Sequence, residues 1–217
     1  CIELYPKKPI YDIPAYPEII AGDLIKKLLE QIKPFNQGYT LGETAVKLKK
    51  NNEGSFIVTT DKGTKHESKI IAIAGGLGTF TPRKPNLDNL EKFEDNGIDY
   101  LVKDPEKYKD KIVLIAGGGD SALDWTLFLS TIAKKVILIH RRNVFRGAEE
   151  SILNVQNLKN RGLIDVLTPT QVVSLKGSSK LESVFIDTDG ESKEIKVDYF
   201  IPLFGLVPKL GPIKDWG

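Results

Sequence analysis

The chain has 217 residues, 41% hydrophobic and 28% charged, and its formal net charge is +2 at pH 7. This length suits one or two domains, and a net charge close to zero argues against a general nucleic-acid binder. No apolar stretch reaches the roughly 18–20 residues that span a membrane, and no signal-peptide pattern opens the chain. A single cysteine, Cys1, excludes an intrachain disulfide framework and fits a reducing compartment. We therefore expect a cytoplasmic protein without nucleic-acid or membrane partners.

The first part of the sequence is expected to form a helix followed by a β-meander. Apolar residues recur at helical spacing between Pro17 and Phe35, and Pro34 stops that helix. Strands are predicted over 41–49, 55–60 and 65–73, with turns at 51–54 and 61–63. Residues 70–76 are interpreted as a buried strand that enters a glycine turn, and 82–103 as polar, irregular chain.

A strand, a glycine-rich loop, a helix and a second strand follow one another between 111 and 139. The first strand, 111–116, is a short run rich in β-branched residues, as is typical of a buried parallel strand. The helix is expected over 121–133 and the second strand over 135–139. The loop between the first strand and the helix matches Gly-x-Gly-x-x-Ala, and it consists of Gly117, Gly118, Gly119, Asp120, Ser121 and Ala122.

This loop predicts a site for a dinucleotide. Its first glycine permits a tight turn, the second lets the backbone approach a pyrophosphate, and Ala122 lets the helix pack closely on the strand. The helix N-terminus then offers free N–H groups and a partial positive charge to the phosphates. The alternative is a structural turn without a ligand. Asp120 and Ser121 either cap the helix or contact the pyrophosphate or ribose.

The end of the second strand indicates which dinucleotide binds. An NAD site expects Asp or Glu there, to accept hydrogen bonds from the ribose 2′-hydroxyl. This chain has instead His140, Arg141 and Arg142, with Arg146 one helical turn further on. Guanidinium groups bind a 2′-phosphate through charge-assisted hydrogen bonds of ~1.5–3 kcal/mol each, which favours NADP. The alternative is a solvated basic patch or a surface for acidic partners.

The remaining sequence continues the same α/β pattern. A helix is predicted over 148–160 and strands over 164–167, 171–175, 181–187, 193–197 and 199–205. Alternating strands and helices followed by a meander are typical of a three-layer nucleotide domain with a small antiparallel sheet on one face.

Taken together, the loop and the arginine cluster resemble the NADP domain of thioredoxin-reductase-like flavoproteins. Thioredoxin reductases carry a redox Cys-x-x-Cys in the helix after the glycine loop, and 123–128 contain no cysteine. A dithiol relay needs two thiols, so the chain instead resembles the ferredoxin–NADP⁺ reductases built on this scaffold. Segments 4–12, 74–84 and 210–217 resemble three further stretches of that family, in the same order.

The resemblance implies an α/β, three-layer FAD/NAD(P)-binding Rossmann-like fold: a nucleotide-binding domain plus an incomplete flavin domain, each with a small β-meander. We place a partial FAD domain at 1–102, the NADP domain at 103–205, and the crossover back into the FAD domain at 206–217. The family's FAD-binding glycine fingerprint and its later Gly-Asp segment are absent, and the chain contains no Met. We therefore expect the central part of a longer flavoprotein, not competent alone.

The implied activity is electron transfer between NADPH and ferredoxin or flavodoxin through FAD, by a homodimer when full length. The protein then holds the two rings in place and no acid–base side chain is needed. Tyr5, Phe80 and Ala45 match the family's flavin contacts, with ordinary packing as the alternative for each. Trp125 is expected between domains, His66 on the surface, and no metal site is predicted. The alternatives are a non-catalytic NADP(H)-binding module or sensor, and an NADPH-dependent flavin reductase with another acceptor.

Overall fold

The computed structural model of the chain describes residues 7, 9–11, 13–76 and 78–216, without the side chains of Thr79 and Phe80. These residues form two compact units. The first consists of Pro82–Gly205 together with the described residues up to Leu28, and the second of Leu29–Thr81 and Leu206–Gly217. The helix α1 (Ala21–Ile32) crosses the division between them. The domains predicted at 1–102, 103–205 and 206–217 remain a prediction.

The first unit is built on a four-stranded sheet of order β13-β7-β8-β9, in which every neighbouring pair is parallel. The strands are β7 (Ile112–Ala116), β8 (Lys135–Ile139), β9 (Asp165–Leu167) and β13 (Tyr199–Pro202). Two helices, α3 (Asp120–Leu129) and α4 (Glu149–Asn160), connect β7 to β8 and β8 to β9. The predicted strand–loop–helix–strand order is therefore confirmed.

Side chains that alternate along the central strand divide the core into two halves. Val113 and Ile115 of β7 face a cluster that includes Leu123 of α3 and Val155 of α4. Leu114, between them, faces the opposite cluster, which is shared with the strands that follow β9. Because successive strand residues point to opposite faces, a continuously apolar strand is the natural sequence for a sheet covered on both sides.

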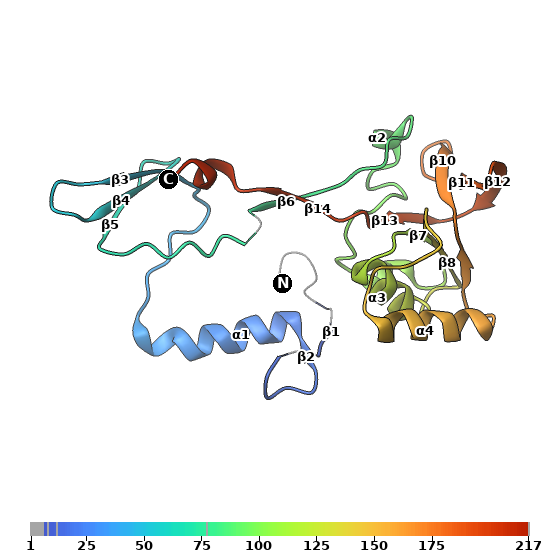
Figure 1. Cartoon of the computed structure of the whole chain (residues 1–217), viewed down its shortest axis with the longest axis horizontal. Coiled ribbons are helices and arrows are strands. Elements are labelled where there is room, and N and C mark those ends of the chain that lie inside the picture. The colour runs from blue at the N-terminus through green and yellow to red at the C-terminus, as the bar shows by residue number, and fades with distance from the viewer. Residues whose placement is uncertain (1–6, 8, 12, 77, 217) are drawn as a thin grey trace. The chain divides into compact units, whose positions relative to one another are not determined.

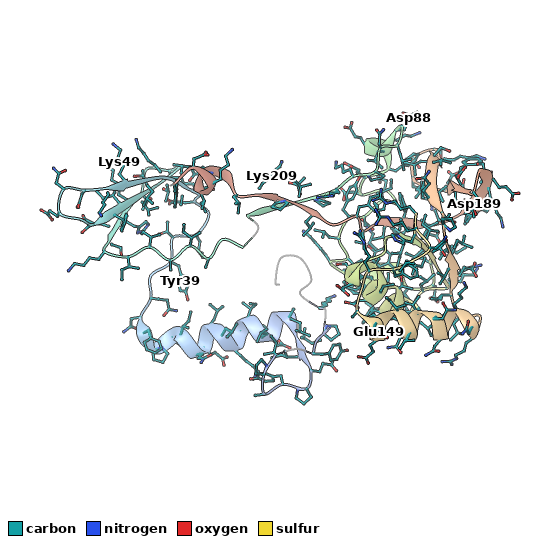
Figure 2. The ribbon with its side chains drawn as sticks, viewed as in Figure 1. Tyr39, Lys49, Asp88, Glu149, Asp189 and Lys209 are labelled. Carbon is teal, nitrogen blue, oxygen red and sulfur yellow. The ribbon has the colours of Figure 1, made fainter. Side chains whose placement is uncertain are left out.

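An antiparallel meander covers the second face of this sheet. It contains β10 (Gln171–Lys176), β11 (Ser183–Thr188) and β12 (Glu191–Lys196). Figure 1 shows α3 and α4 below β7 and β13, with β10 above them. The turn between β11 and β12 places Asp189 and Gly190 at φ 51° and 88°, and Asp189 projects at the end of the meander in Figure 2. Helices, parallel sheet and meander are the three layers predicted from the sequence.

The segment before β7 borders the sheet on its β13 side. It contains α2 (Leu90–Phe93) and the 3₁₀ turn η2 (Pro105–Tyr108). Ile98 forms an isolated parallel bridge with Phe200 of β13. Ile98 and Phe93 are buried in the cluster on the meander face. This segment is therefore part of the core of the first unit rather than a loose connection. The first unit also contains the short pair β1 (Pro9–Ile10) and β2 (Ile19–Ile20).

The second unit contains the meander predicted in the first part of the sequence. Its strands are β3 (Ala45–Lys50), β4 (Phe56–Thr60) and β5 (Lys65–Ser68), joined in antiparallel order. Gly54 and Gly63 occupy the turns at φ 87° and 85°, a conformation that favours glycine. The remaining elements are the strand pair β6 (Thr79–Pro82) and β14 (Leu206–Lys209) and the 3₁₀ turns η1 (Lys33–Phe35) and η3 (Gly211–Asp215).

The prediction of a buried strand over 70–76 is wrong. The structure has no strand there, and the side chains of Ile70 and Ile73 are 80% and 60% exposed. A β-branched run becomes a buried strand only where a neighbouring strand pairs with it and another layer covers it. The described residues supply neither for this segment.

One helix boundary and one residue placement also differ from the prediction. The helix predicted over 121–133 ends at Leu129, with Ser130 as its C-cap, because turns occupy the next residues. Trp125, expected between domains, is buried in the helix-side core of its own unit and packs edge-to-face on Phe128. Over the part of the chain that the structure describes, no helix has the length and apolar content of a membrane span.

Candidate functional site

The carboxyl ends of β7, β8 and β13 meet at one edge of the parallel sheet, where they border a cavity of about 750 Å³. The chain leaves β7 toward β8 on one side, while β13 pairs with β7 on the other. Such a reversal of strand order opens a crevice outside the carboxyl ends of the strands, where α/β proteins bind ligands. The cavity volume lies within the range of small-molecule and cofactor sites.

The glycines of the loop after β7 differ in how much space surrounds them. A Cβ atom on Gly117 would lie 2.7 Å from the Cβ of Ala122 and 2.8 Å from the carbonyl oxygen of Leu203. A Cβ on Gly118 would lie 2.5 Å from Nε2 of His140. A Cβ on Gly119 would meet no atom within 4 Å, and this residue is exposed in the cavity wall. Packing therefore demands the first two glycines, and only Gly119 leaves space that a ligand can use.

The helix α3 begins at the cavity without a side-chain cap. Gly119 is its N-cap residue, and no side chain there hydrogen-bonds to the free N–H groups. Capping is therefore not the role of Asp120 or Ser121. Asp120 instead accepts a hydrogen bond of 2.6 Å at Oδ1 from the N–H of Ala148, while Ser121 is exposed in the cavity wall. The uncapped N-terminus keeps its N–H groups and its partial positive charge for an anion.

Residues 140–148, which follow β8 and are called the arginine segment below, fold back against the glycine loop. The N–H of Arg146 donates to the carbonyl oxygen of Gly118 over 2.6 Å. Arg141 and Arg146 line the cavity, whereas Arg142 does not. All three side chains are exposed, and none has an ion pair or side-chain hydrogen bond to another residue that the structure describes. Their positive charge is therefore uncompensated beside the glycine loop.

His140 packs beneath the glycine loop and also lines the cavity. It is 7% exposed, and its ring stacks on Phe145 with centroids 5.5 Å apart. Burial, and then the charge of Arg146, lower the pKa of the His140 imidazole below its ordinary value. Its Nε2 has no hydrogen-bond partner among the described residues. The geometry makes His140 a neutral support of the two loops.

Part of the cavity wall was missed by the sequence interpretation. Arg83 and Lys84 line the cavity, and the N–H of Arg83 donates to the carbonyl oxygen of Gly205, just beyond β13. Residues 85–87, 170–172, 200 and 203–205 also contribute to the wall. The one signal in the sequence is the basic pair directly after Pro82, which belongs to a segment noted only for its family resemblance.

The predicted flavin contacts are only partly described. Tyr5 lies outside the described residues, and only the backbone of Phe80 is described, within β6. Ala45 is the half-buried first residue of β3. These assignments remain predictions.

Two further expectations concern histidine and metal. His66 lies on β5 as an exposed residue, 3.0 Å from the hydroxyl of Thr40, so its predicted surface position is confirmed. Among the residues that the structure describes, no three His, Cys, Asp or Glu side chains cluster as a metal site would need.

The chain matches the family described as pyridine nucleotide-disulphide oxidoreductase over residues 3–215. It belongs to this family. Membership agrees with a glycine loop at the start of α3 and a cavity at the carboxyl ends of parallel strands.

Three curated relatives are named ferredoxin–NADP reductase. The protein of Flavobacterium johnsoniae is 58% identical and that of Flavobacterium psychrophilum 59%; each alignment covers 99% of this chain, and 61% and 62% of the relative. The protein of Rickettsia bellii is 46% identical, over 100% of this chain and 65% of its own length. The chain therefore spans about three fifths of the length of these relatives.

Solved structures support the fold at lower identity. Thioredoxin reductase from Lactococcus lactis superposes with a TM-score of 0.80 at 23% identity, covering 96% of this chain and 67% of that one. The thioredoxin reductase of T. acidophilum superposes with a TM-score of 0.79 at 22% identity, covering 97% of this chain and 67% of that one. Together with the family match, they confirm the predicted α/β FAD/NAD(P)-binding Rossmann-like fold.

Proposed function

We propose that the cavity at the carboxyl ends of β7, β8 and β13 binds NADP(H). The pyrophosphate would lie on the exposed side of Gly119, facing the free N–H groups of α3. The 2′-phosphate would lie between Arg141 and Arg146. The observation that carries the proposal is the unpaired positive charge of these guanidinium groups at the end of β8, where an NAD site would carry a carboxylate.

The residues present fit this ligand. The open space at Gly119 is the only place in the glycine loop where a Cβ would meet no protein atom. Ser121 presents a hydroxyl to the same cavity. Arginine forms paired, directed hydrogen bonds with phosphate oxygens. Its guanidinium group is also less strongly hydrated than the ammonium group of lysine, so it loses less hydration energy on binding.

We further propose that the chain is the nucleotide-binding, central part of a flavoprotein that passes electrons between NADPH and ferredoxin or flavodoxin. The names of the relatives at 58% and 59% identity support this activity. FAD, when bound, would exchange hydride with the nicotinamide and single electrons with the acceptor. Tyr5, Ala45 and Phe80 would hold it by resemblance, and a cytoplasmic homodimer is part of the same proposal. The chain's own described residues bind and orient the nucleotide.

Nucleotide binding is tested by calorimetric titration of the 217-residue chain with NADP⁺ and NAD⁺. Two charge-assisted contacts to the 2′-phosphate predict a preference for NADP⁺ of about 100-fold. Equal dissociation constants for the two nucleotides would contradict the assignment of Arg141 and Arg146 to the 2′-phosphate.

The electron-transfer activity is tested on the full reading frame. Its product is expected to be yellow and to reduce an artificial acceptor with NADPH far faster than with NADH. A product that binds NADP⁺ without flavin would instead favour a non-catalytic NADP(H)-binding module or sensor. A yellow product that reduces neither ferredoxin nor flavodoxin would favour a flavin reductase with another acceptor.

A further inference from the structure

Lys84 lies in the walls of two neighbouring cavities. One is the cavity assigned to the nucleotide, and the other has a volume of about 450 Å³ and is lined by residues of the 82–108 segment, among them Glu94 and Tyr100. The ammonium group of Lys84 lies 2.6 Å from Oε1 of Glu94 and 5.4 Å from the centre of the Tyr100 ring. Lys84 therefore borders both cavities, and its ammonium group is held by residues of the smaller one.

Lys84 differs from the other basic residues of the nucleotide cavity in having an acidic partner. Arg83, Arg141 and Arg146 have no ion pair with any residue in the described part of the chain. Glu94 holds Lys84 and also accepts a hydrogen bond of 2.6 Å from the hydroxyl of Tyr100. Both hydrogen bonds, that of Lys84 first, lower the pKa of the Glu94 carboxyl, which is therefore ionised at neutral pH.

The topology places Lys84 across the glycine loop from the arginine segment. Arg83 is hydrogen-bonded to Gly205, which follows β13, whereas Arg141 follows β8. Because β7 lies between β13 and β8, its glycine loop lies between the two sets of basic residues. A dinucleotide with its 2′-phosphate at Arg141 would therefore reach Lys84 with its pyrophosphate or beyond, and not with the 2′-phosphate.

The Lys84–Glu94 pair is exposed enough to be broken by a ligand. The side chain of Lys84 is 47% exposed and that of Glu94 is 26% exposed. Ion pairs in such surroundings contribute little net free energy, since water competes for both partners. A pyrophosphate carries more negative charge than one carboxylate and so is a stronger partner for the ammonium group.

We propose that Glu94 competes with the pyrophosphate of the bound dinucleotide for the ammonium group of Lys84, and thereby lowers the affinity of the cavity. This inference rests on the proposed NADP(H) site. Glu94 touches no part of the nucleotide in this scheme; it acts through Lys84. The pair therefore adjusts how tightly the coenzyme is held without changing which coenzyme is preferred.

The test combines Glu94→Gln, Lys84→Ala and the double variant with calorimetric titration of three ligands. Glu94→Gln keeps an oxygen for the Tyr100 hydroxyl and removes the charge, so NADP⁺ and NAD⁺ should both bind about fivefold more tightly. Adenosine 2′-phosphate, which lacks the pyrophosphate, should bind as it does to the wild type. In the Lys84→Ala background, Glu94→Gln should have no effect.

Asp165→Asn is the matched control. It removes one negative charge from another lysine pair of the same unit, Lys135–Asp165, which lies outside the cavity lining. An equal gain in affinity for Asp165→Asn, or a gain from Glu94→Gln that persists without Lys84, would overturn the inference. Failure of the wild type to bind NADP⁺ would instead reject the proposed function.

A second measurement avoids substitution of Glu94. The lysines of the wild-type chain are dimethylated with ¹³C-formaldehyde and a cyanoborohydride reductant, which keeps their charge, and the Lys84 signal is identified by its loss in Lys84→Arg. This signal should shift on addition of NAD⁺ and stay in place on addition of adenosine 2′-phosphate. A Lys84 signal that is insensitive to saturating NAD⁺ would contradict the exchange of partners.

Discussion

The imidazole of His140 fills the space that a Cβ atom on Gly118 would occupy, with Nε2 and Nδ1 only 2.5 and 2.6 Å from that position. The carbonyl oxygen of the same glycine accepts the N–H of Arg146. One residue of the glycine loop therefore holds both ends of the arginine segment. The path of the arginines that we propose to bind the 2′-phosphate therefore depends on Gly118.

The first prediction compares alanine at two adjacent glycines. Gly118→Ala should destabilise the chain by ~1–3 kcal/mol, because the new methyl group overlaps the ring of His140, which is buried and stacked on Phe145. Gly119→Ala should cost less than ~1 kcal/mol, since its backbone is extended (φ −107°, ψ −179°) and its Cβ meets no protein atom. Its nucleotide affinity should nevertheless fall about tenfold, because the methyl group enters the space left for the pyrophosphate.

Urea unfolding and NADP⁺ titration of the two variants distinguish these effects. If Gly119→Ala loses stability but binds NADP⁺ normally, the open space at Gly119 is not the pyrophosphate site.

The second prediction concerns coenzyme preference. Arg141→Ala and Arg146→Ala should each weaken NADP⁺ binding about tenfold or more and leave NAD⁺ binding nearly unchanged, because only NADP⁺ carries the 2′-phosphate. Arg142→Ala is the matched control: Arg142 is equally exposed and is outside the cavity lining. The measurement is the ratio of the NAD⁺ and NADP⁺ dissociation constants. A ratio that changes as much in Arg142→Ala would show that general charge, rather than position, sets the preference.

The third prediction is a pH dependence of stability that originates at His140. Burial and the neighbouring Arg146, Arg141 and Arg142 hold the pKa of His140 below the value of 6.5 expected for an unfolded chain. Below pH 6.5 the unfolded chain therefore takes up a proton at His140 that the folded chain does not. The contribution of His140 to the free energy of unfolding is complete above pH 6.5 and is lost as the pH falls toward the folded-state pKa.

Glutamine does not titrate, so His140→Gln should remove the part of the stability loss at low pH that comes from His140. Urea unfolding at pH 7.5 and pH 5.5 should show a steeper decrease for the wild type than for His140→Gln. His66→Gln is the control, because His66 is exposed on β5 and should leave the pH dependence of the wild type intact. Parallel pH profiles for wild type and His140→Gln would mean that the ring is not held neutral.

The fourth prediction separates the two effects of the Asp120 carboxylate. Its Oδ1 accepts the Ala148 N–H and so ties the end of the arginine segment to the start of α3. Asp120→Ala removes this acceptor and should cost about 1 kcal/mol of stability. Asp120→Asn keeps an acceptor and removes a negative charge beside the phosphates, so it should bind NADP⁺ more tightly than the wild type. Weaker binding by both variants would instead place the carboxylate in contact with the ribose.

The sequence predicted those parts of the site whose signal is local. β8 has the predicted bounds, 135–139, and the loop and arginine segment occupy the predicted positions beside it. Here a single stretch of chain contains strand, glycines and charges, so spacing alone is informative.

The other parts of the site depend on contacts between distant segments. Nothing in the spacing of Arg83 and Lys84 indicates that the Arg83 backbone bonds to Gly205 and so places both side chains in the cavity. The packing of His140 against Gly118 was likewise missed, because it is a contact that spacing does not show, and the predicted role of His140 in cofactor binding stays a prediction. The prediction of a strand over 70–76 was wrong for a related reason. The apolar pattern is local, whereas a buried strand also needs neighbouring strands, which the pattern does not reveal.

The arginine segment is fixed in place almost entirely by bonds to its backbone. The N–H of Arg146 and the N–H of Ala148 hold its far end, and the carbonyl oxygen of His140 accepts the N–H of Thr170 over 2.8 Å at its near end. The guanidinium groups themselves take no part in this anchoring. If Arg141 and Arg146 bind the 2′-phosphate as proposed, a change of coenzyme preference requires only new side chains at positions 141 and 146, on a loop whose course is already set. Under that proposal, the choice of coenzyme can be redesigned, or can drift in evolution, at little cost in stability.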